Sequence, residues 1–175
     1  MRMSEKANYG NWVPAALTNR VLKTYPDSRM IGMDYWGDGW SYAKEQCERN
    51  AEIEGVSTRV TFQKGDAAKL DFEDAYFDGA VSNFVFHEVL SAKDKRDVVR
   101  EALRVIKPGG AFAFQDMFGQ KKIYGDMEEF IKILREEGLV KEIHYIANIE
   151  KKAGVPSLIH TSWMVKNAGL IYGIR

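Results

Sequence analysis

Apolar residues along the chain follow two alternating patterns, one with helical spacing and one with short continuous runs. Helical spacing predicts helices over residues 14–24, 41–54 and 126–137, and one behind a capping box at 91–94 that buries Val98, Ala102 and Ile106. The run 107–110 (KPGG) is expected to stop this last helix. Continuous apolar runs predict strands over 30–34, 60–63, 77–86, 111–114, 142–149 and 168–174.

Strands that alternate with helices of this length indicate βαβ units and a largely parallel sheet. The fold class is therefore α/β, and 175 residues suit a single domain spanning 1–175. In such sheets ligands bind beyond the carboxyl ends of the strands. Candidate functional residues are thus those that directly follow each predicted strand.

Composition narrows the function classes. Lys+Arg and Asp+Glu both number 25, so the formal net charge is zero and no basic excess points to nucleic acid. Cys47 is the single cysteine, which excludes an internal disulfide and fits a reducing, cytoplasmic location. No apolar run reaches the ~18 residues that span a bilayer, and no His/Cys cluster has metal-ligand spacing.

Two acidic residues follow the first two predicted strands. Asp34 could accept both hydroxyls of a ribose, or it could be an ordinary turn or N-cap aspartate. Asp66 could accept from an adenine amino group while the Ala67 N–H meets a ring nitrogen. The alternative for this pair is a simple Gly-Asp turn.

Three further polar residues lie near the ends of the next strands. Asn83 lies in an apolar strand and needs hydrogen-bond partners, either a cofactor's ammonium or carboxylate group or a backbone carbonyl. His87 could act as a general base near neutral pH or have a structural role. Asp116 could face a substrate or cap a turn.

Aromatic residues crowd the loop that follows Asp34. Tyr35, Trp36 and Trp40 stand there beside Gly37 and Gly39. Their rings could cover an adenine face, or they could pack on the adjacent helix.

The order and spacing of four segments carry a family resemblance. These are MIGMD (30–34), VTFQKGDA (60–67), LDFEDAYFD (70–78) and LRVIKPGG (103–110). Together they resemble class I S-adenosylmethionine-dependent methyltransferases, in particular the small-molecule branch that includes ubiquinone/menaquinone-biosynthesis enzymes. The resemblance covers roughly residues 12–138, and the last two predicted strands suit the antiparallel hairpin that closes this Rossmann-like fold.

The resemblance implies roles for matching positions. Asp34 would bind the ribose hydroxyls, with Tyr35 and Trp36 beside the adenine, and Asp66 and Ala67 would contact the adenine edge. Asn83 and Phe84 would lie in the segment beside the methionine end of S-adenosylmethionine. The reaction would be direct displacement of the methyl group onto a small-molecule acceptor, leaving S-adenosylhomocysteine. Such catalysis can rest on proximity and alignment, without a covalent enzyme nucleophile.

The family's first strand and its acid-G-x-G-x-G loop have no counterpart in this sequence. Residues 1–9 lack an apolar run, so we expect 1–11 to be irregular and the fold to be N-terminally truncated or altered. Two inner strands would then have unpaired edges, which a homodimer could cover. Residues 139–175 would hold the last strands and a substrate-side insertion around 151–167, with His160 and Trp163.

Two other functions compete with a methyltransferase. A non-catalytic, methyltransferase-like binding module would explain the missing loop. A nicotinamide-dependent dehydrogenase would also place an acid after a strand, but it needs a G-x-G-x-x-G run that the sequence lacks.

Overall fold

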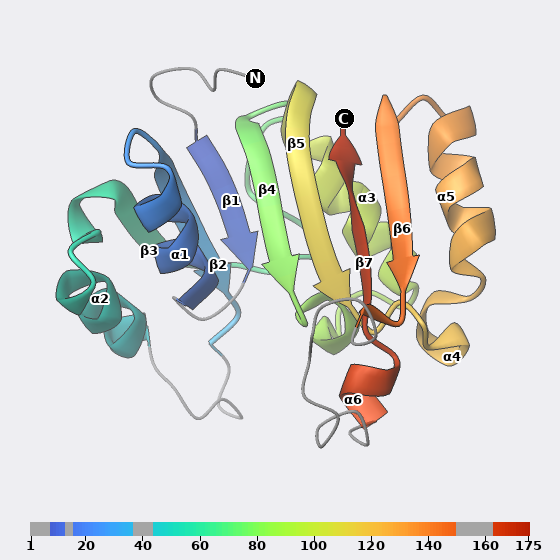
Figure 1. Cartoon of the computed structure of the whole chain (residues 1–175), viewed down its shortest axis with the longest axis horizontal. Coiled ribbons are helices and arrows are strands. Elements are labelled where there is room, and N and C mark those ends of the chain that lie inside the picture. The colour runs from blue at the N-terminus through green and yellow to red at the C-terminus, as the bar shows by residue number, and fades with distance from the viewer. Residues whose placement is uncertain (1–7, 13–15, 37–43, 150–162) are drawn as a thin grey trace.

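The computed structural model describes residues 8–12, 16–36, 44–149 and 163–175 of the chain. Within them, seven strands form one sheet in the order β3-β2-β1-β4-β5-β7-β6 (Figure 1). The strands are β1 (Asn8–Trp12), β2 (Arg29–Asp34), β3 (Val60–Lys64), β4 (Phe77–Asn83), β5 (Ile106–Asp116), β6 (Glu142–Ala147) and β7 (Gly169–Ile174). The helices are α1 (Ala16–Thr24), α2 (Lys44–Ile53), α3 (Lys95–Arg104), α4 (Lys121–Tyr124), α5 (Met127–Glu136) and α6 (Trp163–Lys166), with short 3-10 turns η1 (Ser57–Arg59) and η2 (Phe86–Glu88).

Strand β1 occupies the centre of the sheet, where we expected none. It pairs in parallel with β2 on one side and β4 on the other, and Asn11 aligns with both Gly32 and Val81. The expectation that 1–11 is irregular is therefore wrong for residues 8–11, and no inner edge is left open at this point. Backbone N–H and C=O groups make these ladders, so a segment as polar as NYGNW can complete them. The open inner edges for which we expected a compensating homodimer are therefore closed by β1.

Amide hydrogen exchange gives a direct test of β1. A strand paired on both sides exchanges through large-scale opening, whereas a surface segment exchanges almost freely. We expect the amides of residues 9–11 to exchange at least as slowly as those of the edge strand β3, measured by NMR. Exchange as fast as that of the exposed turn residue Asp27 would contradict the central strand.

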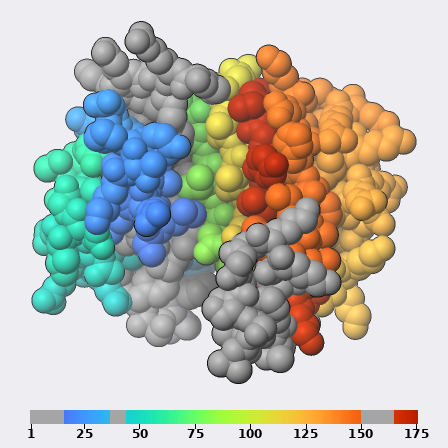
Figure 2. Space-filling view, viewed as in Figure 1, coloured from blue at the N-terminus to red at the C-terminus, as the bar shows by residue number. Residues whose placement is uncertain are grey.

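Helices cover the two faces of the sheet in different places. On the face nearest the viewer in Figure 1, α1 and α2 lie over the β1–β3 half. Their contact with the sheet is a core of Leu22, Met30, Cys47, Ala51, Val56 and Phe62. Helices α3 and α5 lie on the far face, over a larger core that includes Leu103, Phe112, Phe114, Phe130 and Leu134. Green and yellow atoms of β4 and β5 stay visible between the two halves in Figure 2.

Most predicted elements are confirmed, with shifted ends. The antiparallel pairing of β7 with both β5 and β6 confirms the C-terminal hairpin. The strand predicted over 77–86 ends at Asn83, because Phe84 has a positive φ of 54° and starts a different backbone path. The last residues of the strand predicted over 142–149 likewise leave the sheet, since Asn148 has a φ of 52°. Residues 14–15 and 41–43 of two predicted helices lie outside the described residues.

Two details around α3 differ from the sequence prediction. Asp94, not Ser91, caps the helix, because its side chain accepts from the Arg96 N–H at 2.9 Å. Ile106 does not belong to the buried face of the helix but begins β5, opposite Phe77. The helix ends at Arg104, before the run 107–110. This run lies inside β5, and the pairing of β4 with β5 shifts in register there, between Phe77 and Gly79.

The predicted substrate-side insertion around 151–167 is described only from residue 163 onward. There, Trp163–Lys166 forms the short helix α6 before β7 begins. His160 lies outside the described residues.

Candidate functional site

The carboxyl ends of the parallel strands meet at one edge of the sheet. Gly32 of β2 and Val81 of β4 align with the same β1 residue, so Asp34 and Asn83, two residues further along, lie at the same level. Asn83 in turn aligns with Gln115, next to Asp116 at the end of β5. The fold therefore brings three of the predicted strand-end residues to one edge, as a parallel sheet requires.

Asp34 is held by the backbone of its own turn. Its Oδ1 accepts a hydrogen bond from the Trp36 N–H at 3.2 Å, and its side chain is half-buried. This bond is typical of an Asx turn, which orients the carboxylate. The structure therefore shows the turn role that was the alternative for Asp34.

The aromatic residues after Asp34 separate in the structure. The Tyr35 side chain is 59% exposed, and the Lys64 Nζ lies 5.2 Å from the centre of its ring. Trp36 instead packs against the core formed with α1 and α2, which is the packing alternative for this residue. Its backbone φ is 39°, and its buried Nε1 has no hydrogen-bond partner within the described parts of the chain. Trp40 lies outside the described residues.

Asp66 follows β3, the strand that pairs with β2. The Gly65 N–H donates to the Asp34 carbonyl oxygen at 2.9 Å, so the two acids follow neighbouring strand ends. The Asp66 carboxylate accepts from the Ala68 N–H at 2.9 Å, which is the turn role predicted as an alternative. Ala67 is 7% exposed and packs in the larger core. The turn at Asp66 and Ala67 thus follows directly on the contact between Gly65 and Asp34.

The end of β4 is strained and polar. Phe84 adopts a positive φ that side chains other than glycine rarely take, and its N–H donates to the Gln115 carbonyl at 2.8 Å. Asn83 is half-buried, while the Ser82 Oγ is buried without a partner in the ranges described. Strain and unsatisfied groups of this kind concentrate at functional sites.

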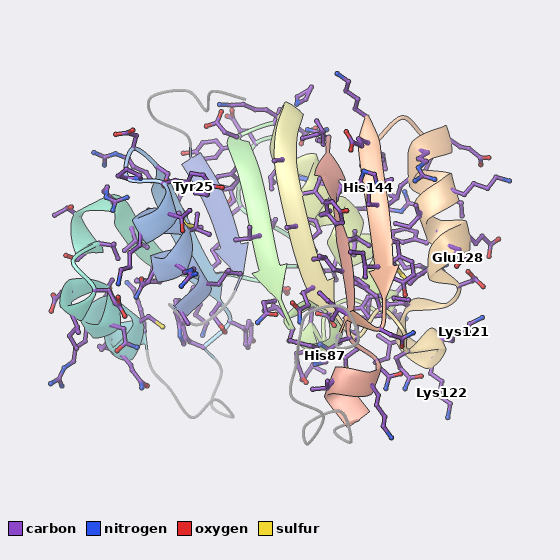
Figure 3. The ribbon with its side chains drawn as sticks, viewed as in Figure 1. Tyr25, His87, Lys121, Lys122, Glu128 and His144 are labelled. Carbon is purple, nitrogen blue, oxygen red and sulfur yellow. The ribbon has the colours of Figure 1, made fainter. Side chains whose placement is uncertain are left out.

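His87 and Asp116 form a buried pair beyond β4 and β5. The His87 Nδ1 lies 2.7 Å from the Asp116 Oδ1, and the side chains are 6% and 0% exposed. Asp116 also accepts from two backbone N–H groups, those of Phe86 at 2.9 Å and Met117 at 2.7 Å. Figure 3 shows His87 at the carboxyl ends of these strands.

The surroundings of His87 shift its proton affinity. Burial alone lowers the pKa of His87, but hydrogen bonds and charges from Asp116 and Glu88 outweigh this, so the pKa lies above 6.5. The Glu88 Oε1 lies 3.1 Å from Nε2, and the Glu88 side chain is 53% exposed. Sequence reasoning named His87 and Asp116 separately and missed the pair. Because His87 follows β4 and Asp116 ends β5, and these two strands are neighbours, their positions could have predicted the pair.

Comparison with known proteins now assigns the family. A family model described as a methyltransferase domain matches residues 14–114, more than half of the chain. The chain therefore belongs to the methyltransferase domain family, and its sheet has the class I, Rossmann-like arrangement.

Individual relatives agree with this assignment. The chain is 32% identical over 93 residues to a sterol 24-C-methyltransferase of Aspergillus fumigatus, covering 53% of this chain and 23% of that protein. It is 45% identical over 56 residues to a ubiquinone/menaquinone biosynthesis C-methyltransferase of Pseudomonas fluorescens, covering 32% and 21%. The fold matches a geranyl diphosphate methyltransferase in complex with geranyl diphosphate and sinefungin, with a TM-score of 0.67, 13% identity and coverage of 99% and 74%. The chain thus spans less than a quarter of the length of these two curated relatives.

The described residues fit part of a nucleoside cofactor. Two carboxylates at neighbouring strand ends suit a ribose diol and an adenine amino group, and the amide of Asn83 suits an amino acid group. Among the residues that the structure describes, the buried Ser82 Oγ has no hydrogen-bond partner, so a ligand could complete its hydrogen bonding. The loop after β1 falls at 13–15, outside the described residues.

Of the helices in the described ranges, none has the length and apolar character needed to cross a membrane. Within the same ranges, His, Cys, Asp and Glu side chains form no group of three or more that could hold a metal ion.

Proposed function

We propose that this domain binds S-adenosylmethionine at the carboxyl ends of β1, β2 and β4 and transfers its methyl group to a small-molecule acceptor. The observation that carries the proposal is Asp34, an acid that a turn hydrogen bond orients at the end of β2 in a chain of this family. When bound, the cofactor supplies a methyl group on a positively charged sulfur.

In this proposal, each site residue contacts a different part of the cofactor. Asp34 accepts the ribose hydroxyls, with the exposed Tyr35 alongside the base, and the turn at Asp66 and Ala67 lines the adenine edge. Asn83 and Phe84, on the strained end of β4, align the methionine end. The acceptor then reacts by alignment along the methyl–sulfur axis, as proximity catalysis requires.

Calorimetry with S-adenosylhomocysteine tests cofactor binding without an acceptor. We expect the unmodified chain to bind and Asp34→Ala to weaken the affinity by about 10- to 100-fold, because hydrogen bonds to a charged group are lost. Asp27→Ala is the matched control, since Asp27 is exposed in the turn before the amino end of the same strand. The control should bind like the unmodified chain.

Two results would count against the proposal. A folded, unmodified chain that shows no heat of binding would favour the non-catalytic binding module instead. Equal affinities for Asp34→Ala and Asp27→Ala would remove Asp34 from the site while leaving cofactor binding intact.

A further inference from the structure

A cavity of about 150 Å³ opens at the amino ends of β2 and β3. The residues that line it are Arg29, Met30, Ile31, Thr58, Arg59, Val60 and Thr61. It lies at the end of the sheet away from the strand-end carboxylates. Figure 3 shows this separation: Tyr25, whose carbonyl oxygen accepts from Arg59 at 3.4 Å, lies at the opposite end of the sheet from His87. The cavity is smaller than the ~300–1,000 Å³ of sites that enclose drug-sized ligands, so it suits a small group.

Two arginines stand side by side in this cavity. Arg29 and Arg59 directly precede Met30 and Val60, which are paired in register on the two strands. Neighbouring strands lie about 4.8 Å apart, and like charges at facing positions of a sheet destabilise the pairing. The two guanidinium groups therefore gain from any anion that binds between them.

Acidic side chains of the described residues leave this charge uncompensated. None lines the cavity. Glu54, in the turn before β3, pairs with Lys23 at 2.5 Å, and the exposed Asp27 forms no ion pair with either arginine in the ranges described. The compensating charge can thus come from a ligand.

The Arg59 guanidinium is fixed in place by the backbone. Its Nη1 donates to the carbonyl oxygens of Leu22, Tyr25 and Ser28 at 3.0, 3.4 and 3.3 Å. Its Nε and Nη2 form no hydrogen bond with other parts of the chain that the structure describes. An arginine edge with two such donors matches two oxygens of an oxyanion, and holding it in advance reduces the entropy lost on binding.

We propose that this cavity binds a phosphate group, at a second site that is separate from the cofactor edge of the sheet. Arg59 binds two phosphate oxygens through Nε and Nη2, Arg29 binds from the neighbouring strand, and the hydroxyls of Thr58 and Thr61 are further donors. Phosphate fits better than a carboxylate, because its tetrahedral oxygens can meet donors on both strands at once. The group is either free inorganic phosphate or the phosphate of a monoester.

Phosphate titration of the full chain, followed through backbone amide signals by NMR, tests the site. Chloride keeps the ionic strength constant, so that screening does not imitate binding. We expect saturable shifts at residues 58–61, and Arg29→Gln should weaken the affinity about tenfold because a charge-assisted contact is lost. Arg29 is exposed, so this variant should fold. Arg49→Gln removes the same charge from the exposed side of α2 and should titrate like the unmodified chain.

Glycerol 3-phosphate in a parallel titration distinguishes the two sources of the group. Tighter binding of inorganic phosphate identifies the free ion, and tighter binding of the ester identifies a phosphorylated molecule. Shifts that rise without saturation, shifts centred on Asp34 and Asp66, or equal affinities in Arg29→Gln and Arg49→Gln would overturn the proposal. S-adenosylhomocysteine carries no phosphate, so each of these failures would leave the proposed function unaffected.

Discussion

Gly173→Ala is expected to destabilise the domain by about 3 kcal/mol, at the upper end of the usual cost of overpacking. A Cβ at this position would lie 2.0 Å from the Glu142 carbonyl oxygen and 2.9 Å from the Ile143 Cα. These are backbone atoms of β6, which is paired to β7 along its length, so they cannot rotate away. The gain from restricting the unfolded chain, about 0.4 to 1 kcal/mol, offsets only part of this cost.

Urea unfolding followed by circular dichroism measures the effect. Gly169→Ala is the matched control, because it makes the same change in the same strand. Its Cβ would lie 3.0 Å from the Phe118 Cβ, 3.1 Å from the Tyr145 Cε2 and 3.4 Å from the Ile146 carbonyl oxygen. These contacts are tight but far less severe than the 2.0 Å contact at Gly173, so the loss should stay at about 1 kcal/mol. If the two variants lose the same free energy of unfolding, the close approach of β6 and β7 at Gly173 is not as described.

The sequence was informative where side-chain periodicity reflects burial. Helix α5 shows this: Phe130, Ile131 and Leu134 are buried, and Asp126 caps the helix through the Glu128 and Glu129 N–H groups. The pattern of apolar positions and the cap residue are local, so they can be read without knowing the fold.

Strand β1 shows where this reasoning stops. The five residues NYGNW have neither apolar alternation nor a continuous apolar run. They become a strand because β2 and β4 offer hydrogen-bonding edges on both sides, which is a property of the assembled sheet. The cap of α3 was also not decided by the sequence, because Ser91 and Asp94 both have side chains that can cap a helix. The structure shows that Asp94 is the cap.

The candidate site, too, was predictable from the sequence only in part. The sequence predicted that residues after the strands would gather, and the register of β1, β2, β4 and β5 places Asp34, Asn83 and Asp116 at one edge. It did not show that Asp116 points into the core and binds His87, since 29 residues separate the two in the sequence. Only the adjacency of β4 and β5 brings them into contact.

Asp116→Ala is expected to cost about 3 to 5 kcal/mol of the free energy of unfolding, the range for removing one partner of a buried pair. The substitution leaves the Phe86 and Met117 N–H groups and the buried His87 ring without their acceptor. Asp74→Ala removes a carboxylate that is 75% exposed and pairs with Arg104, so it serves as control and should cost under about 1 kcal/mol.

The pH dependence of the same measurement identifies the interaction. The pKa of His87 is raised in the folded state, so its contribution to stability is fully present below pH 6.5 and is lost as pH rises through the folded-state pKa. The unmodified chain should therefore lose stability over that window. In Asp116→Ala, burial still lowers the pKa of His87, but the hydrogen bond and charge of Asp116 no longer raise it. The loss of stability with rising pH should therefore shrink or reverse. An equally steep loss in the variant and the unmodified chain would show that the proton affinity of His87 does not depend on Asp116.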